Sequence, residues 1–274
     1  MQNIPNTMFM KKTFAIVNLL SVILVLLVNG LSQSQRWNDT TIGEISDEYS
    51  NLFTPAGYAF AIWGLIFLML IGYALFQIRR AFFSKKESSF IEQTGWWFTI
   101  ANVCNAGWVV AFMYGYVGIS VIIMLGILVS LLQIVRKTNM ERWDAPIEVI
   151  AFVWWPICIY AGWIAVATIA NFSAFFASID FTGSEFTQIL WTMIMITIAV
   201  LVNTFMVWLR NMREFALVAV WALIAIYVRH KEGIESIAYY ALCGAIVLIA
   251  IISLHAFNNR KTAPHLKLKE RLSK

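Results

Sequence analysis

Residues Val117–Val135 read VGISVIIMLGILVSLLQIV and contain no charged side chain. A helix needs about 20 apolar residues to cross the ~30 Å of hydrocarbon in a bilayer, and this run is close to that length. The runs Phe14–Leu31 and Ile237–Ile252 are also free of charge. Core helices of soluble proteins rarely reach such lengths without a charged residue. The pattern therefore predicts a membrane protein whose spans are α-helices.

The composition of the 274 residues supports the same interpretation. Hydrophobic residues make up 60% of the chain and charged residues only 13%, which is about half the charged fraction of a soluble domain. The net charge of +5 comes from Lys and Arg that lie mostly beside apolar runs, where they set orientation in the membrane. The expected partner is thus the lipid bilayer, and no nucleic acid.

Eight segments are apolar enough to be membrane spans. Backbone N–H and C=O groups find no water inside hydrocarbon, so each segment is expected to be an α-helix. The predicted fold class is all-α, a polytopic transmembrane helical bundle of about eight spans. The predicted spans are Thr13–Leu31, Ala56–Ile78, Trp96–Tyr114, Val117–Val135, Pro146–Ser178, Ile189–Leu209, Glu214–Val228 and Ile237–Phe257.

The distribution of positive charge predicts the orientation of these spans. If the chain crosses eight times, all of its 20 Lys and Arg residues except Arg36, Arg229 and Lys231 fall on one side. Cytoplasmic segments of membrane proteins carry such an excess, so both the N- and C-termini are expected in the cytoplasm. Removing the last two spans together would preserve this bias, so charge alone does not fix the count near the C-terminus.

Two polar segments lie outside the predicted spans. The external loop 32–54 is acidic and, at 23 residues, longer than ordinary connections. Such a loop serves either as a lid or as a solvated connector, and the sequence leaves both open. The segment 258–274 is basic and is predicted to lie against anionic lipid headgroups.

Several features of enzymes and pumps are missing from the sequence. Ionisable residues at membrane depth mark ion pathways and proton relays, but Glu148, Glu214 and His255 all lie near span ends. The sequence also contains no recognisable nucleophile–base pair or phosphate-binding glycine loop. A hydrolase, kinase or proton-driven pump is therefore disfavoured, a binding role is favoured over catalysis, and no cofactor or metal is expected.

Aromatic and amide side chains inside the predicted spans are the features that indicate a function. Four of the twelve tryptophans, Trp63, Trp108, Trp163 and Trp221, lie well inside predicted spans, where an indole N–H requires a partner. The amides at this depth either bond across helices to hold the bundle together or line an aromatic pocket for a flat, mostly apolar ligand. The candidate acceptors are Asn102, Asn105, Asn171 and Tyr160.

Three motifs on the second, third and fifth spans resemble those of the translocator-protein family (TspO/MBR, the tryptophan-rich sensory proteins). Tyr160–Asn171, reading YAGWIAVATIAN, resembles the fifth-helix signature, with Trp three residues after the Tyr and Asn eleven after it. Thr54–Phe67, reading TPAGYAFAIWGLIF, resembles the second-helix signature. Asn105-Ala-Gly-Trp108 resembles the third-helix Asn-x-x-Trp motif. The motifs stand in family order and at family spacing.

The resemblance covers residues 13–178 and implies two parts. Residues 1–178 are expected to form the family's five-helix transmembrane bundle, and residues 179–274 a three-helix transmembrane extension with a basic cytoplasmic tail. The sequence departs from the family at the expected pocket mouth. The first Pro of a pair is Thr54, and the Trp expected two residues after Pro55 is Gly57. These departures bear on the identity of the ligand more than on the fold.

The resemblance also implies ligands and site residues. Family members bind porphyrins and other tetrapyrroles, sterols and synthetic aromatic molecules among the helices beneath the first long loop, and they often form homodimers. A multi-pass protein of the bacterial cytoplasmic (inner) membrane is expected. The residues carried over as pocket or pocket-supporting positions are Trp63, Asn105, Trp108, Tyr160, Trp163 and Asn171, with Tyr58 and Phe60 at the mouth.

Three functions follow from these observations. The leading hypothesis is a membrane receptor or sensor that binds a porphyrin-like or sterol-like molecule in the intramembrane aromatic pocket. A second is a transporter of apolar or amphipathic small molecules, in which the three additional helices complete a path. A third is a membrane enzyme that modifies tetrapyrroles, using Trp or Tyr in a light-driven oxidation.

Overall fold

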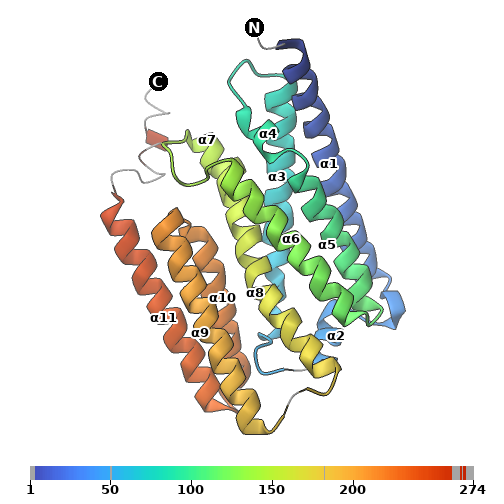
Figure 1. Ribbon diagram of the computed structural model, residues 1–274, viewed down its shortest axis with the longest axis vertical. Coiled ribbons are helices and arrows are strands. Elements are labelled where there is room, and N and C mark those ends of the chain that lie inside the picture. The colour runs from blue at the N-terminus through green and yellow to red at the C-terminus, as the bar shows by residue number, and fades with distance from the viewer. Residues whose placement is uncertain (1–3, 50, 182, 261–265, 267, 270–274) are drawn as a thin grey trace.

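The computed structural model describes residues 4–49, 51–181, 183–260, 266, 268 and 269, and within them every regular element is helical (Figure 1). Eight helices of 17 residues or more lie side by side. They are α1 (Ile4–Ser34), α3 (Ile62–Phe82), α5 (Trp97–Met113), α6 (Val117–Lys137), α8 (Trp155–Ser178), α9 (Glu185–Arg210), α10 (Arg213–His230) and α11 (Glu235–Asn258).

Within the described part of the chain, six segments are long and apolar enough to cross a membrane: Met8–Ser34, Gly57–Phe82, Val117–Lys137, Ile147–Ser178, Glu185–Arg210 and Glu235–Asn258. The other two long helices are shorter. α5 is apolar with 17 residues, and α10 has 18 residues with its charged side chains confined to its two ends. The predicted polytopic helical bundle is confirmed.

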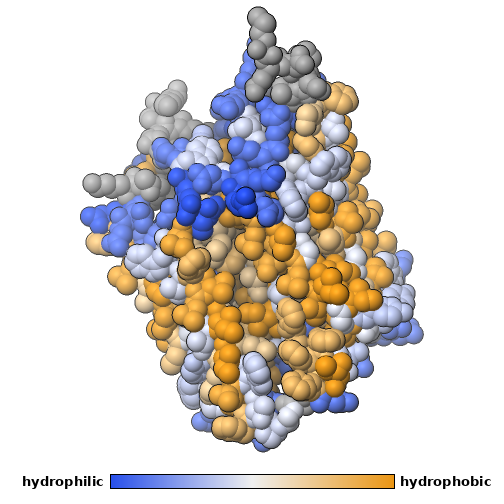
Figure 2. Space-filling view, in the orientation of Figure 1, coloured by the Kyte–Doolittle hydropathy of each residue, from blue (hydrophilic) through white to orange (hydrophobic). Residues whose placement is uncertain are grey.

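The outer surface of the bundle is apolar. On the face shown in Figure 2, hydrophobic residues form a broad band, and polar residues gather mainly toward one end. Within this band Leu68 is 67% exposed, Ile122 70% and Leu201 62%. Soluble monomers rarely expose contiguous apolar patches of this extent, whereas lipid tails solvate them readily. The chain is therefore an integral membrane protein.

The start of α1 and the end of α11 lie at the same end of the bundle, opposite the short helix α2 (Ile42–Glu48) (Figure 1). An even number of crossings requires this arrangement. The predicted contact of segment 258–274 with lipid headgroups stays a prediction. Most of its charges, on Lys261, Lys267, Arg271 and Lys274, lie outside the described residues.

The observed helix bounds agree with the predicted spans, with two informative differences. α1 begins at Ile4 rather than Thr13, because Lys11 and Lys12 continue the helix beyond the apolar run. α3 begins only at Ile62, because residues 57–61 form the 3₁₀ helix η2 (Gly57–Ala61). Before η2, the N–H of Ala56 donates to the carbonyl of Ala225 on α10, far along the sequence, rather than to a nearby residue.

The long fifth span contains an irregular turn. The short helix α7 (Ile147–Val149) continues into η3 (Ile150–Trp154), which is a π-helix, and then into α8. Pro156, in the first turn of α8, has no N–H to bond the carbonyl four residues earlier, and π-turns accommodate such a gap. The irregular turn lies near the start of this long span.

The eight helices pack as two groups that meet along α8 and α10. In the first group α6 and α3 pack against α8, α5 packs against α6, and α1 packs against α3 and α5; α9, α10 and α11 form the other group (Figure 1). Gly162 of α8 permits close contact, because a Cβ at this position would lie 2.7 Å from the carbonyl oxygen of Phe215 on α10. The three C-terminal helices are thus packed tightly against the N-terminal five.

Polar side chains join helices within the first group. Asn18 of α1 donates from Nδ2 to Gln77 Oε1 of α3 at 2.9 Å, and its Oδ1 accepts from Thr99 Oγ1 of α5 at 2.8 Å. Asn102 of α5 donates to Ser21 Oγ of α1 at 2.9 Å. For Asn102 the packing interpretation of the buried amides is therefore the one observed.

Candidate functional site

Aromatic rings from η2, α3 and α8 cluster near the α2 end of the bundle. The Trp163 ring centroid lies 6.0 Å from that of Phe60 and 6.4 Å from that of Trp63, both in edge-to-face geometry. The Tyr160 ring lies 6.1 Å from Trp63. Such arrangements are favourable for aromatic pairs and hold each ring in a fixed orientation.

A second aromatic group lies on α5. The rings of Trp108 and Phe112 stack at 5.0 Å. Trp108 Nε1 donates to Asn171 Oδ1 of α8 at 2.6 Å, and Asn171 Nδ2 donates to Ser120 Oγ of α6 at 2.9 Å. The Asn171 side chain of α8 therefore links α5 and α6 through hydrogen bonds.

A narrow cavity of about 50 Å³ lies between these two aromatic groups. Its wall contains very little polar surface, and Trp163, which is only 2% exposed, has no hydrogen-bond partner for its Nε1–H among the residues that the structure describes. The side chains that border the cavity are Phe60, Trp63, Trp108, Phe112, Met124, Trp163, Val166, Ala167, Ala170, Asn171 and Ala174, with Ile42, Ser46, Thr54 and Pro55 at the loop side.

The structure brings five of the eight predicted site residues to this cavity: Phe60, Trp63, Trp108, Trp163 and Asn171. The other three lie elsewhere. Tyr160 and Asn105 are buried behind the wall, where Asn105 Nδ2 donates to Tyr160 Oη at 3.0 Å. Tyr58 is 43% exposed and packs edge-to-face on Trp221, outside the cavity.

A structured segment covers the loop side of the cavity. α1 continues to Ser34, and after η1 (Trp37–Asp39) the helix α2 supplies Ile42 and Ser46 to the wall. The predicted external loop is thus partly helical. We call residues 35–49 and 51–56, which include α2 and Pro55, the roof.

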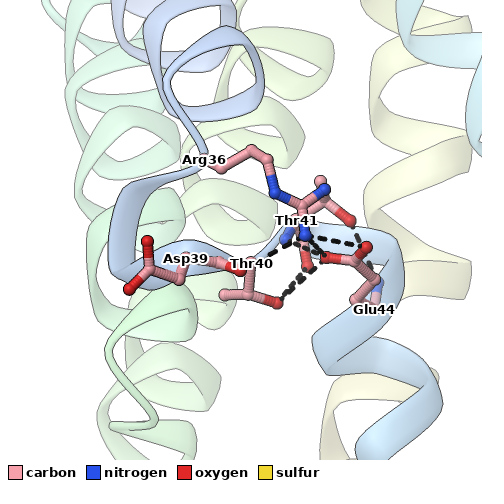
Figure 3. Close-up of polar contacts among 5 residues, drawn as sticks. All are labelled: Arg36, Asp39, Thr40, Thr41 and Glu44. Carbon is pink, nitrogen blue, oxygen red and sulfur yellow. Dashed lines mark hydrogen bonds and ion pairs between the residues drawn. The ribbon is translucent and has the colours of Figure 1, made fainter.

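A polar network fixes the start of α2 (Figure 3). Thr41 Oγ1 accepts from the N–H of Glu44 at 3.2 Å, and Glu44 Oε2 accepts from the N–H of Thr41 at 2.8 Å, which forms a capping box. Arg36 Nη2 donates to the same carboxylate at 2.9 Å, and this bond lowers the pKa of Glu44. The helix α2 within the roof therefore has a defined start.

Comparison with protein families identifies the chain. A family described as TSPO-like protein matches residues 15–254. The chain belongs to the TSPO-like family. No curated protein and no solved structure shows significant similarity to it.

Membership in the TSPO-like family confirms the resemblance inferred from the three motifs. It indicates, in general terms, a membrane protein that senses or binds a ligand. The match extends through α9 and α10 and into α11, beyond the residues that carry the motifs. The C-terminal helices are thus included in the family match.

Helix α10 of this TSPO-like protein holds the roof in place. Arg229 Nη1 donates to Asp47 Oδ1 at 3.1 Å, and His230 Nε2 donates to the carbonyl of Leu52 at 2.9 Å. Trp221 Nε1 donates to the carbonyl of Ala59 at 3.1 Å. The C-terminal group therefore supports the covering of the cavity as well as packing against α8.

Sequence reasoning missed one face of α8. Val166, Ala167, Ala170 and Ala174 border the cavity, and they follow Trp163 at helical spacings of three to eleven residues. These spacings place them on the same face as Trp163. The small alanine side chains leave room beside the aromatic rings. The helical spacing of these small residues after Trp163 could have indicated this face from the sequence alone.

Proposed function

We propose that this TSPO-like protein binds a flat, hydrophobic aromatic molecule, such as a porphyrin or another tetrapyrrole, in the cavity between Trp63, Trp108 and Trp163. A sterol-like molecule is the related alternative ligand. The binding serves reception or sensing at the membrane. Aromatic walls with a few convergent polar groups are typical of sites for such ligands.

The observation that carries this proposal is the unpaired indole N–H of Trp163. A buried donor without an acceptor costs about 1–3 kcal/mol relative to a paired one. Trp163 Nε1 is buried, has no partner and belongs to a residue on the cavity wall. A carboxylate or carbonyl oxygen on a bound ligand would satisfy it, whereas the ring faces would contact the apolar body of the ligand.

The volume of the cavity sets a condition on this proposal. Sites for drug-sized ligands usually enclose about 300–1,000 Å³, whereas this cavity measures about 50 Å³. Binding of a tetrapyrrole therefore requires the roof to move away from α8. The roof is held by hydrogen bonds from Arg229 and His230 of α10 and by the bond from Asn38 Nδ2 to the carbonyl of Met113. Its buried side chains Ile45 and Phe53 pack on the core, so opening breaks these contacts as well.

Titration of the purified protein with protoporphyrin tests the proposal. We expect saturable quenching of tryptophan fluorescence, and at least about tenfold weaker affinity in Trp163→Phe, since both a donor and ring surface are lost. The matched change Trp96→Phe, at an outward-facing ring that is 54% exposed, should leave the affinity unchanged. Quenching without saturation, or equal affinity in the two variants, would refute the proposal.

We further propose that the protein resides in the bacterial cytoplasmic membrane with both termini inside and the roof outside. The positions of Arg36, Arg229 and Lys231 support this orientation. All three lie at the roof end, whereas Arg79, Arg80 and the other basic residues lie near the opposite end. A ligand would then enter from the external side, through the roof.

A further inference from the structure

A second cavity, of about 290 Å³, lies at the end of the bundle opposite the roof. Its wall combines the segment before α7, the junction between α9 and α10, and the last turn of α11, which meet at the upper left of Figure 1. Unlike the aromatic cavity, its surface is more polar than apolar. Because its wall contains residues of both helix groups, this second cavity lies between them, on the side predicted to be cytoplasmic.

Four buried atoms on this wall have no hydrogen-bond partner among the described residues: Glu141 Oε1, Arg213 Nε, Glu214 Oε2 and His255 Nδ1. His255 is only 4% exposed. Native proteins pair nearly all buried polar atoms, so four unpaired atoms around one cavity indicate that a polar occupant belongs there.

Other contacts hold three of these four residues, Glu141, Glu214 and His255, in place. Trp155 Nε1 donates to Glu214 Oε1 at 3.1 Å, which leaves only Oε2 unpaired. The Trp208 ring packs edge-to-face on His255 at 5.8 Å. The backbone carbonyl of Glu141 accepts from Asn211 Nδ2 at 2.8 Å. The unpaired atoms thus belong to residues that the fold already positions, as in a preformed binding site.

The charges on the wall define the chemistry of the occupant. The wall also carries Arg142 and Asp144, but the charged groups with an unpaired buried atom are Glu141, Glu214 and Arg213. The carboxyl groups of Glu141 and Glu214 can accept hydrogen bonds from a cation, and the guanidinium of Arg213 can donate to an anion. No group of three or more His, Cys, Asp or Glu side chains that could hold a metal ion occurs in the described part of the chain. A molecule that carries both charges satisfies this wall better than a simple ion does.

We propose that this cavity binds a compact zwitterion, with a primary ammonium against Glu141 and Glu214 and a phosphate or carboxylate against Arg213. The zwitterion is either a free solute or the headgroup of phosphatidylethanolamine, since the cavity lies where headgroups are expected. Phosphatidylcholine has the same charges but no ammonium N–H to donate, so it does not satisfy the carboxylates.

The protonation of Glu141 is consistent with an occupant that supplies a positive charge. Burial, and then the negative charge of Glu214, raise the pKa of Glu141 to about 8, and the charge of Arg213 only partly opposes this. A carboxyl group in this state lacks a cation close enough to keep it ionised. An ammonium group bound beside it would restore the ionised form.

The test uses the full chain in nanodiscs of phosphatidylcholine. Titration with O-phosphoethanolamine, followed by calorimetry, measures binding of the free zwitterion. Native mass spectrometry, after equilibration with phosphatidylethanolamine, measures retention of the lipid. Saturable binding of the soluble probe identifies a free solute as the source, and retention of phosphatidylethanolamine alone identifies the headgroup. If neither binds, the proposal is wrong.

Variants connect the binding to this cavity. Glu214→Gln keeps the Oε1 acceptor for Trp155 but removes the charge, and Arg213→Gln removes the guanidinium; each should weaken binding about tenfold. Arg213→Lys keeps the positive charge and should bind within a few-fold of the unmodified protein, which excludes misfolding as the cause. Glu235→Gln and Lys231→Gln, at the opposite end, are the matched controls. Equal binding in Arg213→Gln and Lys231→Gln would overturn the proposal.

Discussion

Two buried tryptophans on facing helices differ in one hydrogen bond. Trp108 Nε1 donates to Asn171, whereas Trp163 Nε1 has no acceptor. Replacement by Phe removes similar ring surface from both, but only Trp108→Phe also removes a hydrogen bond made in the ligand-free protein. We expect Trp108→Phe to lower the free energy of unfolding by about 1 kcal/mol more than Trp163→Phe does. Thermal unfolding in detergent measures the difference, and a reversed order would contradict this account.

The sequence predicted a group of candidate acceptors for the buried indole N–H groups, but not which acceptor pairs with which indole. Three amides and one phenol at similar depth were candidate acceptors, and the structure uses Asn171 for Trp108 and a backbone carbonyl for Trp221. The choice depends on how each helix is rotated about its axis. Rotation follows from the packing of all eight helices, and spacing along one helix does not determine it.

Glu141 makes stability depend on pH. Its pKa is raised from an ordinary 4.5 to about 8 by burial and by Glu214, so folding favours the protonated carboxyl group. The stability that this proton contributes is complete below about pH 4.5 and is lost as the pH rises through about 8. We therefore expect the melting temperature to fall between about pH 5 and about pH 8.5.

Comparison of variants isolates the contribution of Glu141. In Glu141→Gln the fall in melting temperature should be smaller, while the exposed change Glu235→Gln should keep the slope of the unmodified protein. The same slope in all three proteins would show that Glu141 is not responsible. The other charged groups near Glu141 are unchanged in both variants: Arg142, Asp144, Arg210, Arg213, Glu214 and His255.

Among the elements, the roof helix α2 has only seven residues and a capping box at its start, so the cap is a large part of what stabilises it. Thr41→Ala removes the side-chain acceptor of the capping box, a change that costs about 1 kcal/mol. If ligand entry requires the roof to move, the association rate of protoporphyrin should increase by up to about fivefold. Stopped-flow fluorescence measures this rate.

A matched cap elsewhere provides the control. Ser184 caps α9 by accepting from the N–H of Thr187 at 3.4 Å, and it does not border the aromatic cavity. Ser184→Ala should therefore leave the association rate unchanged. If both variants, or neither, bind protoporphyrin faster than the unmodified protein, α2 does not control entry.

The long helices could be predicted from apolar runs because the bilayer imposes their length and character. The short elements could not be predicted in this way. η2 forms where the chain bonds to α10, a contact that the sequence of residues 57–61 does not encode. α2 did carry a local signal, Thr41 followed three residues later by Glu44, which is the pattern of a capping box.

At the scale of the whole molecule, one glycine controls how closely the two helix groups approach. A Cβ at position 162 would lie 2.7 Å from Phe215 O and 3.2 Å from Val218 Cβ. Gly162→Ala should therefore separate α8 from α10 and cost about 1–3 kcal/mol. Gly107→Ala, in α5, meets nothing within 4 Å and should be neutral or slightly stabilising. Thermal unfolding compares the two, and equal effects would show that this contact is not critical.

The orientation of the molecule in its membrane is open to a direct test. The three native cysteines, at positions 104, 158 and 243, all lie within long helices, so a water-soluble maleimide should label the parent protein poorly. Asp47→Cys places a thiol in the roof, and Lys85→Cys places one between α3 and α4 (Ser89–Thr94) at the opposite end. With both termini inside, intact cells should label at position 47 and label at position 85 only after permeabilisation. Labelling at both positions in intact cells would show that the spans are miscounted, and the reverse pattern would place the roof in the cytoplasm.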